Sequence, residues 1–153
     1  MLILSGNPGC GKTYLCSCIV SWMFGKVRDI YALKESEFFD RIRSSMDMKG
    51  DYRSEIEYQC DHDFFVYDDI GSTGQGSSTG WRQEVLFEVI NLRYESQRPT
   101  ILTTNFTRQE IKEKLGWRTF SRMYAQENSI IEMFGYPDLR FPANTSKEAS
   151  NLP

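Results

Sequence analysis

The sequence predicts an α/β protein in which helices cover both faces of one parallel sheet. Short apolar runs alternate with longer amphipathic segments along the 153 residues, as in strand–helix–strand units. A glycine-rich turn separates the first apolar run from the first helical segment. The composition, 40% hydrophobic and 25% charged, is that of an ordinary globular chain with one core.

The expected elements follow this alternation in order. Strands are predicted at residues 1–5, 30–33, 64–67, 100–104 and 130–134. Helices are predicted at residues 13–24, 35–46, 54–60, 81–96, 107–115 and 118–126. Gly25 favours the end of the first helix, and Pro99 prevents the fourth from continuing. Thr107, with Glu110 three residues later, predicts a capping box. Glycine-rich residues 71–80 are expected to form a flexible loop.

Charge, hydropathy and cysteine usage argue against several classes of protein. A net charge of -3 and a pI of about 5.3 show no overall electrostatic attraction to nucleic acid. No apolar run is long enough for a membrane span and no signal peptide is visible, so a cytoplasmic protein without membrane partners is expected. The four cysteines form no C-x-x-C pair, so reduced thiols are expected rather than a zinc site. His62 has no partner pattern and is predicted to be a surface residue.

The glycine-rich turn fits a phosphate-binding motif. Residues 6–13, GNPGCGKT, match G-x-x-x-x-G-K-[ST] and lie between a predicted strand and a predicted helix. Backbone amides and the helix N-terminus would hold phosphates, Lys12 would bridge the β- and γ-phosphates, and Thr13 would bind Mg²⁺. The predicted nucleotide-binding residues are Gly6, Asn7, Pro8, Gly9, Cys10, Gly11, Lys12, Thr13 and Tyr14. The sequence therefore predicts a P-loop NTPase that binds ATP and Mg²⁺.

Two further strands end in polar side chains. The run Phe64–Tyr67 is followed by Asp68 and Asp69, and the run 100–104 is followed by Asn105. Asp68 is predicted to hold the magnesium shell, as a Walker B aspartate does. Asp69 is predicted to orient or deprotonate the attacking water, with Asn105 positioning that water. Aspartate reaches less far than glutamate, so slow turnover is expected.

The string of motifs resembles one family. Asp68-Asp69-Ile70-Gly71, residues 85–95, Arg98-Pro99-Thr100-Ile101, Thr104-Asn105 and residues 115–123 are similar to the AAA+ ATPases of the DnaC-type helicase-loader and IstB-type transposition-helper group. The resemblance covers almost the whole chain to Arg140. It implies the AAA+ form of the P-loop NTPase fold, with a five-stranded parallel sheet flanked by helices.

The resemblance also implies roles for three arginines. Arg122 matches the arginine finger that enters the neighbouring subunit's ATP site, and Arg118, one turn earlier, would support it. Arg140 matches the sensor II arginine, which contacts the γ-phosphate within the same subunit. A permanently charged, planar guanidinium suits developing phosphoryl charge. A site completed in trans implies an ATP-dependent homo-oligomer.

The family couples ATP state to single-stranded DNA and to a replicative helicase, and both are expected partners by resemblance. Residues 1–141 are expected to be an AAA+ ATPase core without the family's N-terminal partner-binding region, and residues 142–153 a loose tail. Acidic residues lie among the chain's own candidates for DNA binding. These candidates are Lys26, Arg28, Arg41, Arg43, Lys49, Arg53, Tyr52 and Tyr58.

Other functions stay open at this point. An IstB-like transposition helper would carry the same motifs and differ only in its partner. A nucleotide-gated adaptor with negligible turnover is compatible with the short Asp69. A P-loop phosphotransferase acting on a small acceptor would give no role to Asn105, or to Arg122 in trans.

Overall fold

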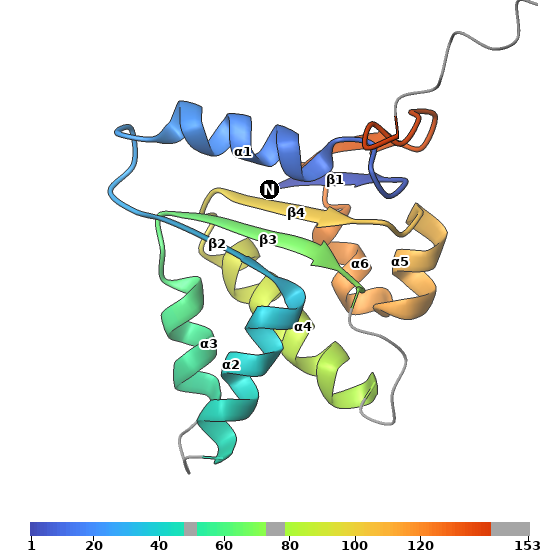
Figure 1. The fold of residues 1–153 in the computed structure, drawn as a ribbon. Helices are drawn as coiled ribbons and strands as arrows, with labels where there is room; N and C mark the ends of the chain where they lie inside the picture. The colour runs from blue at the N-terminus through green and yellow to red at the C-terminus, as the bar shows by residue number, and fades with distance from the viewer. Residues whose placement is uncertain (48–51, 73–78, 142–153) are drawn as a thin grey trace, which may run out of the picture.

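The sheet is the framework of the molecule. The computed structural model describes residues 1–47, 52–72 and 79–141. Within these ranges five strands pair in parallel, in the order β2-β3-β4-β1-β5 (Figure 1). Their bounds are β1 Leu2–Gly6, β2 Ile30–Lys34, β3 Phe64–Ile70, β4 Thr100–Thr104 and β5 Ser129–Met133. The predicted five-stranded parallel sheet is confirmed.

Helices cover both faces of the sheet, as predicted. The helices in the described ranges are α1 Lys12–Met23, α2 Glu35–Asp47, α3 Tyr52–Cys60, α4 Thr79–Glu95, α5 Arg108–Lys114 and α6 Trp117–Met123. In Figure 1, α1 lies on one face and the other helices lie on the opposite face. The predicted capping box of Thr107 and Glu110 is present at the start of α5.

The three inner strands, β3, β4 and β1, are buried on both faces, which produces two clusters. Leu4 and Val66 pack under α1, whereas their neighbours Ile3 and Phe65 pack against the other helices. This alternation explains why the strands read as continuous apolar runs in the sequence. The larger cluster lies between the sheet, in which β4 is the central strand, and the helices α2–α6.

Some predicted boundaries differ from the observed ones. The strand predicted to end at Tyr67 continues to Ile70, and the β3–β4 register shifts between these two residues. The helix predicted at 118–126 ends at Met123, where the Asn128 side-chain amide donates to the carbonyls of Arg122 (2.6 Å) and Met123 (3.1 Å). Residues 73–78 of the predicted flexible loop and the predicted tail 142–153 lie outside the described residues.

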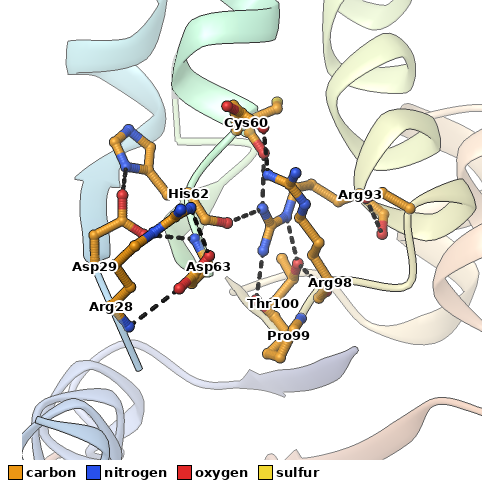
Figure 2. A network of polar contacts seen from close by, with 11 residues as sticks. Arg28, Asp29, Cys60, His62, Asp63, Arg93, Arg98, Pro99 and Thr100 are labelled. Carbon is orange, nitrogen blue, oxygen red and sulfur yellow. Dashed lines mark hydrogen bonds and ion pairs between the residues drawn. The ribbon is translucent and has the colours of Figure 1, made fainter. Parts of the chain in front are cut away.

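A buried arginine organises the opposite end of the sheet from the glycine-rich turn (Figure 2). Arg93 of α4 is 1% exposed and donates to the carbonyls of Cys60, His62 and Pro99 and to the hydroxyl of Thr100. Burial lowers its pKa to about 10. One side chain therefore ties α4 to the residues that precede β3 and to the start of β4.

The prediction that His62 is a surface residue is wrong. Only 18% of its side chain is exposed, its ring stacks on Tyr31 with centroids 4.5 Å apart, and its Nδ1 pairs with Asp29 Oδ2 at 2.9 Å. Both of these partners, Tyr31 and Asp29, are more than 30 residues away in the sequence, so no local pattern indicated them.

Candidate functional site

The glycine-rich turn joins β1 to α1 at the carboxyl edge of the sheet. Gly9 (φ 78°) and Gly11 (φ 97°) both adopt the left-handed region, where side chains other than glycine are strained. Gly11 is the N-cap residue of α1, which begins at Lys12. The loop thus has the backbone shape and the helix N-terminus that a phosphate-binding turn requires.

Lys12 is folded inward against this loop. It is 7% exposed, and its ammonium donates to the carbonyls of Gly6 (2.8 Å) and Asn7 (2.9 Å) and to Asn105 Oδ1 (2.8 Å). The contact with Asn105 spans the gap between β1 and β4, which are neighbours in the sheet. The structure therefore brings the P-loop lysine and the predicted water-positioning asparagine together.

Thr13 and Asp68 lie side by side, as their predicted roles require. Thr13 Oγ1 is 3.2 Å from both carboxylate oxygens of Asp68. Hydroxyl and carboxylate oxygens are the donors that Mg²⁺ prefers. The described residues contain no group of three or more His, Cys, Asp or Glu that could hold a metal ion. At the predicted magnesium site, Thr13 and Asp68 would supply two protein ligands, and nucleotide phosphates and water would supply the rest.

Asp69 is held next to Asp68 in an unusual backbone conformation. Its φ is 62°, which is uncommon for a residue with a side chain. Asn105 Nδ2 donates to Asp69 Oδ1 at 3.0 Å, while Asn105 Oδ1 accepts from Lys12. Asn105 therefore connects the P-loop lysine to the second acid, and left-handed residues that persist in a structure cluster at functional sites.

The segment after β5 packs directly on the P-loop. Asn7 Nδ2 donates to the carbonyl of Phe134 (2.7 Å), and the Leu139 amide donates to the carbonyl of Gly9 (3.0 Å). A Cβ on Gly9 would lie 1.9 Å from Asp138 Oδ1, so only glycine permits this approach. We call residues 134–140 the clasp; it lies beside the P-loop in Figure 1.

Arg140 belongs to this clasp, but its contacts are with Asp138. The guanidinium donates through Nε and Nη2 to the two Asp138 oxygens at 2.9 and 2.6 Å. These hydrogen bonds lower the pKa of Asp138 to about 2. The predicted sensor II arginine is thus near the P-loop through the clasp, paired with a carboxylate.

Arg122 and Arg118 make their contacts on α4. Arg122 Nε donates to Asn91 Oδ1 at 2.9 Å, and both guanidinium groups lie over the Phe87 ring, at 5.1 Å for Arg122 and 3.8 Å for Arg118. Arg118 also pairs with Glu84 at 3.5 Å. The structure therefore does not bring these two arginines to the P-loop cluster of the same chain.

The remaining predicted nucleotide-site residues differ in exposure. Cys10 is buried, whereas the Tyr14 side chain is 76% exposed. A groove of about 430 Å³ runs along α1 from Thr13 and Asp68 to Val20 and is closed on its other side by β2. Tyr14 does not line this groove.

The predicted DNA-binding candidates are dispersed and largely engaged. Arg28 pairs with Asp63 at 3.1 Å, the Lys26 ammonium lies 3.1 Å from the Trp22 ring centroid, and Arg53 is 3.9 Å from Glu88. Lys49 lies outside the described residues. The Tyr58 ring is exposed. The described part of the chain contains no helix long and apolar enough to cross a membrane.

Sequence reasoning missed two residues at the site. Thr103 donates to Asp68 Oδ1 at 2.6 Å and accepts from the Asp69 amide at 2.8 Å. Asp138 packs on Gly9 from far along the chain. The pair Thr103-Thr104, at the carboxyl end of a strand beside the acidic pair, was a signal for the first; nothing local indicated the second.

The fold and the site define a P-loop domain of the AAA+ class. The sequence matches the family described as IstB-like ATP binding protein over residues 1–123. That match covers well over half of the chain, so the protein belongs to this family and is of the DnaC/IstB type.

Curated relatives agree with this assignment. The chain is 23% identical over 139 residues to the replicative helicase loader DnaC of Escherichia coli (strain K12), covering 90% of this chain and 55% of that protein. It is 25% identical over 127 residues to the phage-like element PBSX protein XkdC of Bacillus subtilis (strain 168), covering 78% of this chain and 46% of that protein. The chain thus spans about half the length of these relatives.

Solved structures show the same fold. The crystal structure of the DnaC helicase loader has a TM-score of 0.72 at 24% identity, over 86% of this chain and 77% of that chain. AMPPCP-bound DnaA from Aquifex aeolicus has a TM-score of 0.71 at 17% identity, over 86% of this chain and 39% of that chain. Identities this low show the fold alone.

Proposed function

We propose that the protein binds ATP with Mg²⁺, hydrolyses it slowly, and uses the nucleotide state to engage a replicative helicase on single-stranded DNA. The observation that carries the proposal is the convergence of Lys12, Thr13, Asp68, Asp69 and Asn105 in one hydrogen-bonded cluster, whose two halves are joined by Thr103. Membership of an ATP-binding family supports the nucleotide.

Each side chain has a task in this proposal. The loop amides and Lys12 bind the phosphates, so the ammonium exchanges carbonyl acceptors for phosphate oxygens. Thr13 and Asp68 would hold Mg²⁺, which would neutralise phosphate charge. Asn105 keeps Asp69 oriented, and Asp69 directs a water at the γ-phosphate and accepts its proton. Water attacks phosphorus, the bond to the β-phosphate oxygen breaks, and ADP and phosphate result.

Two arginines complete the site from different places. Arg140, released from Asp138, contacts the γ-phosphate within the same chain. Arg122 stabilises the transferring phosphoryl group bound to a neighbouring copy of the chain. Its position between α4 and α6, away from the P-loop of its own chain, supports this action in trans. Turnover therefore requires a homo-oligomer.

The helicase and DNA partners rest on the relatives. A replicative helicase loader matches 90% of this chain, which favours a helicase as partner. The family description equally supports a transposition-helper role of the IstB kind. Binding of purified hexameric helicase, compared with binding of a transposase from the same source, separates these two readings.

The central test is ATP turnover across a range of protein concentrations, with and without single-stranded DNA. The proposal expects turnover per chain to rise with concentration, to respond to DNA, and to be lost in Lys12→Ala and Arg122→Ala. Lys112→Ala, at an exposed cation on neighbouring α5, is the matched control and should retain turnover.

The other outcomes of this test have definite meanings. ATP binding without turnover at any concentration supports the nucleotide-gated adaptor instead. Full activity of monomeric Arg122→Ala contradicts completion in trans and supports a phosphotransferase with its own acceptor.

A further inference from the structure

Thr103 contacts both acids of the site, the side chain of Asp68 and the backbone of Asp69. It lies in β4, next to the strand that carries Asp68 and Asp69, and is 1% exposed. Its hydroxyl donates to Asp68 Oδ1 at 2.6 Å and accepts the backbone N–H of Asp69 at 2.8 Å. A threonine hydroxyl has one proton and two lone pairs, so it satisfies both bonds at once.

The hydroxyl replaces backbone pairing at a break in the sheet. The β3–β4 register shifts between Tyr67 and Ile70, which is where Asp69 adopts its φ of 62°. At this break the Thr103 hydroxyl, rather than a backbone carbonyl, accepts the hydrogen bond from the Asp69 amide. Thr104, the next residue, donates its own hydroxyl to the Ile70 carbonyl at 2.8 Å. The end of β3 is therefore held by hydroxyl groups of β4 rather than by ladder bonds alone.

The same bond orients the Asp68 carboxylate. The short contact with Thr103 occupies one position on Oδ1 and fixes the rotation of the group. Thr13 Oγ1, at 3.2 Å, then faces both oxygens equally. A carboxylate fixed in this way presents its oxygens to a cation without losing rotational freedom on binding.

We propose that Thr103 is a positioning residue for this site: its hydroxyl orients Asp68 for Mg²⁺ and holds the backbone of Asp69 for water activation. This inference rests on the proposed ATP–Mg²⁺ function. The hydrogen bonds of the Thr103 side chain are to Asp68 and Asp69 and not to the P-loop, so loss of its hydroxyl should reduce the gain in affinity from Mg²⁺ and leave phosphate binding by the P-loop in place.

The test compares Thr103→Val, which removes the hydroxyl at nearly constant shape, with Thr103→Ser, which keeps it. The readout is the affinity for a fluorescent ATP analogue in Mg²⁺ and in EDTA, measured on the full chain. Removing a group that orients a metal ligand weakens metal binding by about 10-fold or more. Thr103→Val should therefore lower the Mg²⁺-dependent gain in affinity about 10-fold, with the affinity in EDTA unchanged. Thr103→Ser should keep the wild-type gain in affinity from Mg²⁺.

The control is Thr100→Val, which removes another buried hydroxyl at the opposite end of the same strand, where it accepts from Arg93. It should lower thermal stability and leave the Mg²⁺ gain intact. The inference is overturned if Thr103→Val keeps the full gain, or if Thr103→Ser loses as much as Thr103→Val. If the wild-type protein shows no gain in affinity from Mg²⁺, the proposed function itself is contradicted. This outcome is distinct from failure of the Thr103 inference alone.

Discussion

Asn105 shows how one amide serves two charged groups. Its oxygen accepts from Lys12 and its nitrogen donates to Asp69, so the orientation of the amide is fixed from both ends. The amide cannot be flipped, because the Lys12 ammonium only donates hydrogen bonds and the Asp69 carboxylate only accepts them. The residue thus links Lys12, which is proposed to bind phosphate, to Asp69, which is proposed to direct water.

Replacing Asn105 by Ala should slow turnover much more than it weakens binding. Asp69 loses the donor that orients it, and a misplacement of about 1 Å costs about 100-fold in rate. We expect kcat to fall about 100-fold with a small change in KM, measured by steady-state ATPase assays. Gln109→Ala, at an exposed amide on α5, is the control. An unchanged kcat would remove Asn105 from the mechanism.

Asp138 is expected to oppose nucleotide binding. Its carboxylate packs against Gly9, and a pKa of about 2 keeps it charged at every working pH. Asp138→Asn removes this anion and frees Arg140, so ATP affinity should rise about two- to fivefold. Isothermal titration of ATP checks this. Arg140→Ala should shift affinity the other way, and a weaker affinity in Asp138→Asn would be inconsistent with the expectation.

Among the elements, α4 depends on its buried arginine. Arg93→Met leaves the carbonyls of Cys60, His62 and Pro99 without their donor, and should cost roughly 3 kcal/mol in the free energy of unfolding. Urea denaturation measures it. Arg98→Ala breaks an exposed ion pair with Asp61 and should cost less than about 1 kcal/mol. Equal costs for the two variants would show that the network does not stabilise the fold.

The start of α5 should give a pH-dependent contribution to stability. Hydrogen bonds from the Thr107 backbone amide, the Lys114 ammonium and the Thr107 hydroxyl lower the pKa of Glu110 to about 2, below its value in an unfolded chain. This contribution is fully present above the unfolded pKa and is lost as pH falls through about 2. The stability difference between wild type and Glu110→Gln should therefore be constant near neutral pH and shrink in acid. Denaturation at several pH values tests this, with Glu113→Gln as the control.

Local chemistry made α5 predictable, whereas the end of β3 was not. The cap of α5 is encoded in four consecutive residues, Thr107 to Glu110. The continuation of β3 to Ile70 depends on hydroxyl groups from β4, which the apolar pattern of β3 does not contain. The P-loop, Asp68 and Asn105 were recognisable because each comes directly after an apolar run in the sequence. The contact of Asp138 with Gly9 joins positions 129 residues apart and has no local signature.

At the scale of the whole molecule, nucleotide binding should stabilise the fold, because the site joins β1, α1, β3 and β4. A ligand at 100 times its Kd adds about 2.7 kcal/mol. For a chain of this size that corresponds to a rise in Tm of roughly 5–10 °C. Thermal unfolding with and without ATP–Mg²⁺ measures the shift, and Lys12→Ala should abolish it. An equal shift in Lys12→Ala would place the binding site elsewhere.

The strand order has a consequence for how the protein folds. β1 precedes every other element in the sequence, yet its partners in the sheet are β4 and β5, in which Leu2 pairs with Ile101 and with Ser129. During synthesis, at roughly 5–20 residues per second, this apolar strand waits several seconds before either partner exists. The phosphate-binding loop, which depends on β1 and on the clasp, is therefore among the last parts to become ordered. We therefore expect any ability to bind ATP to appear late in folding, and chaperones would be expected to protect the unpaired β1 segment until then.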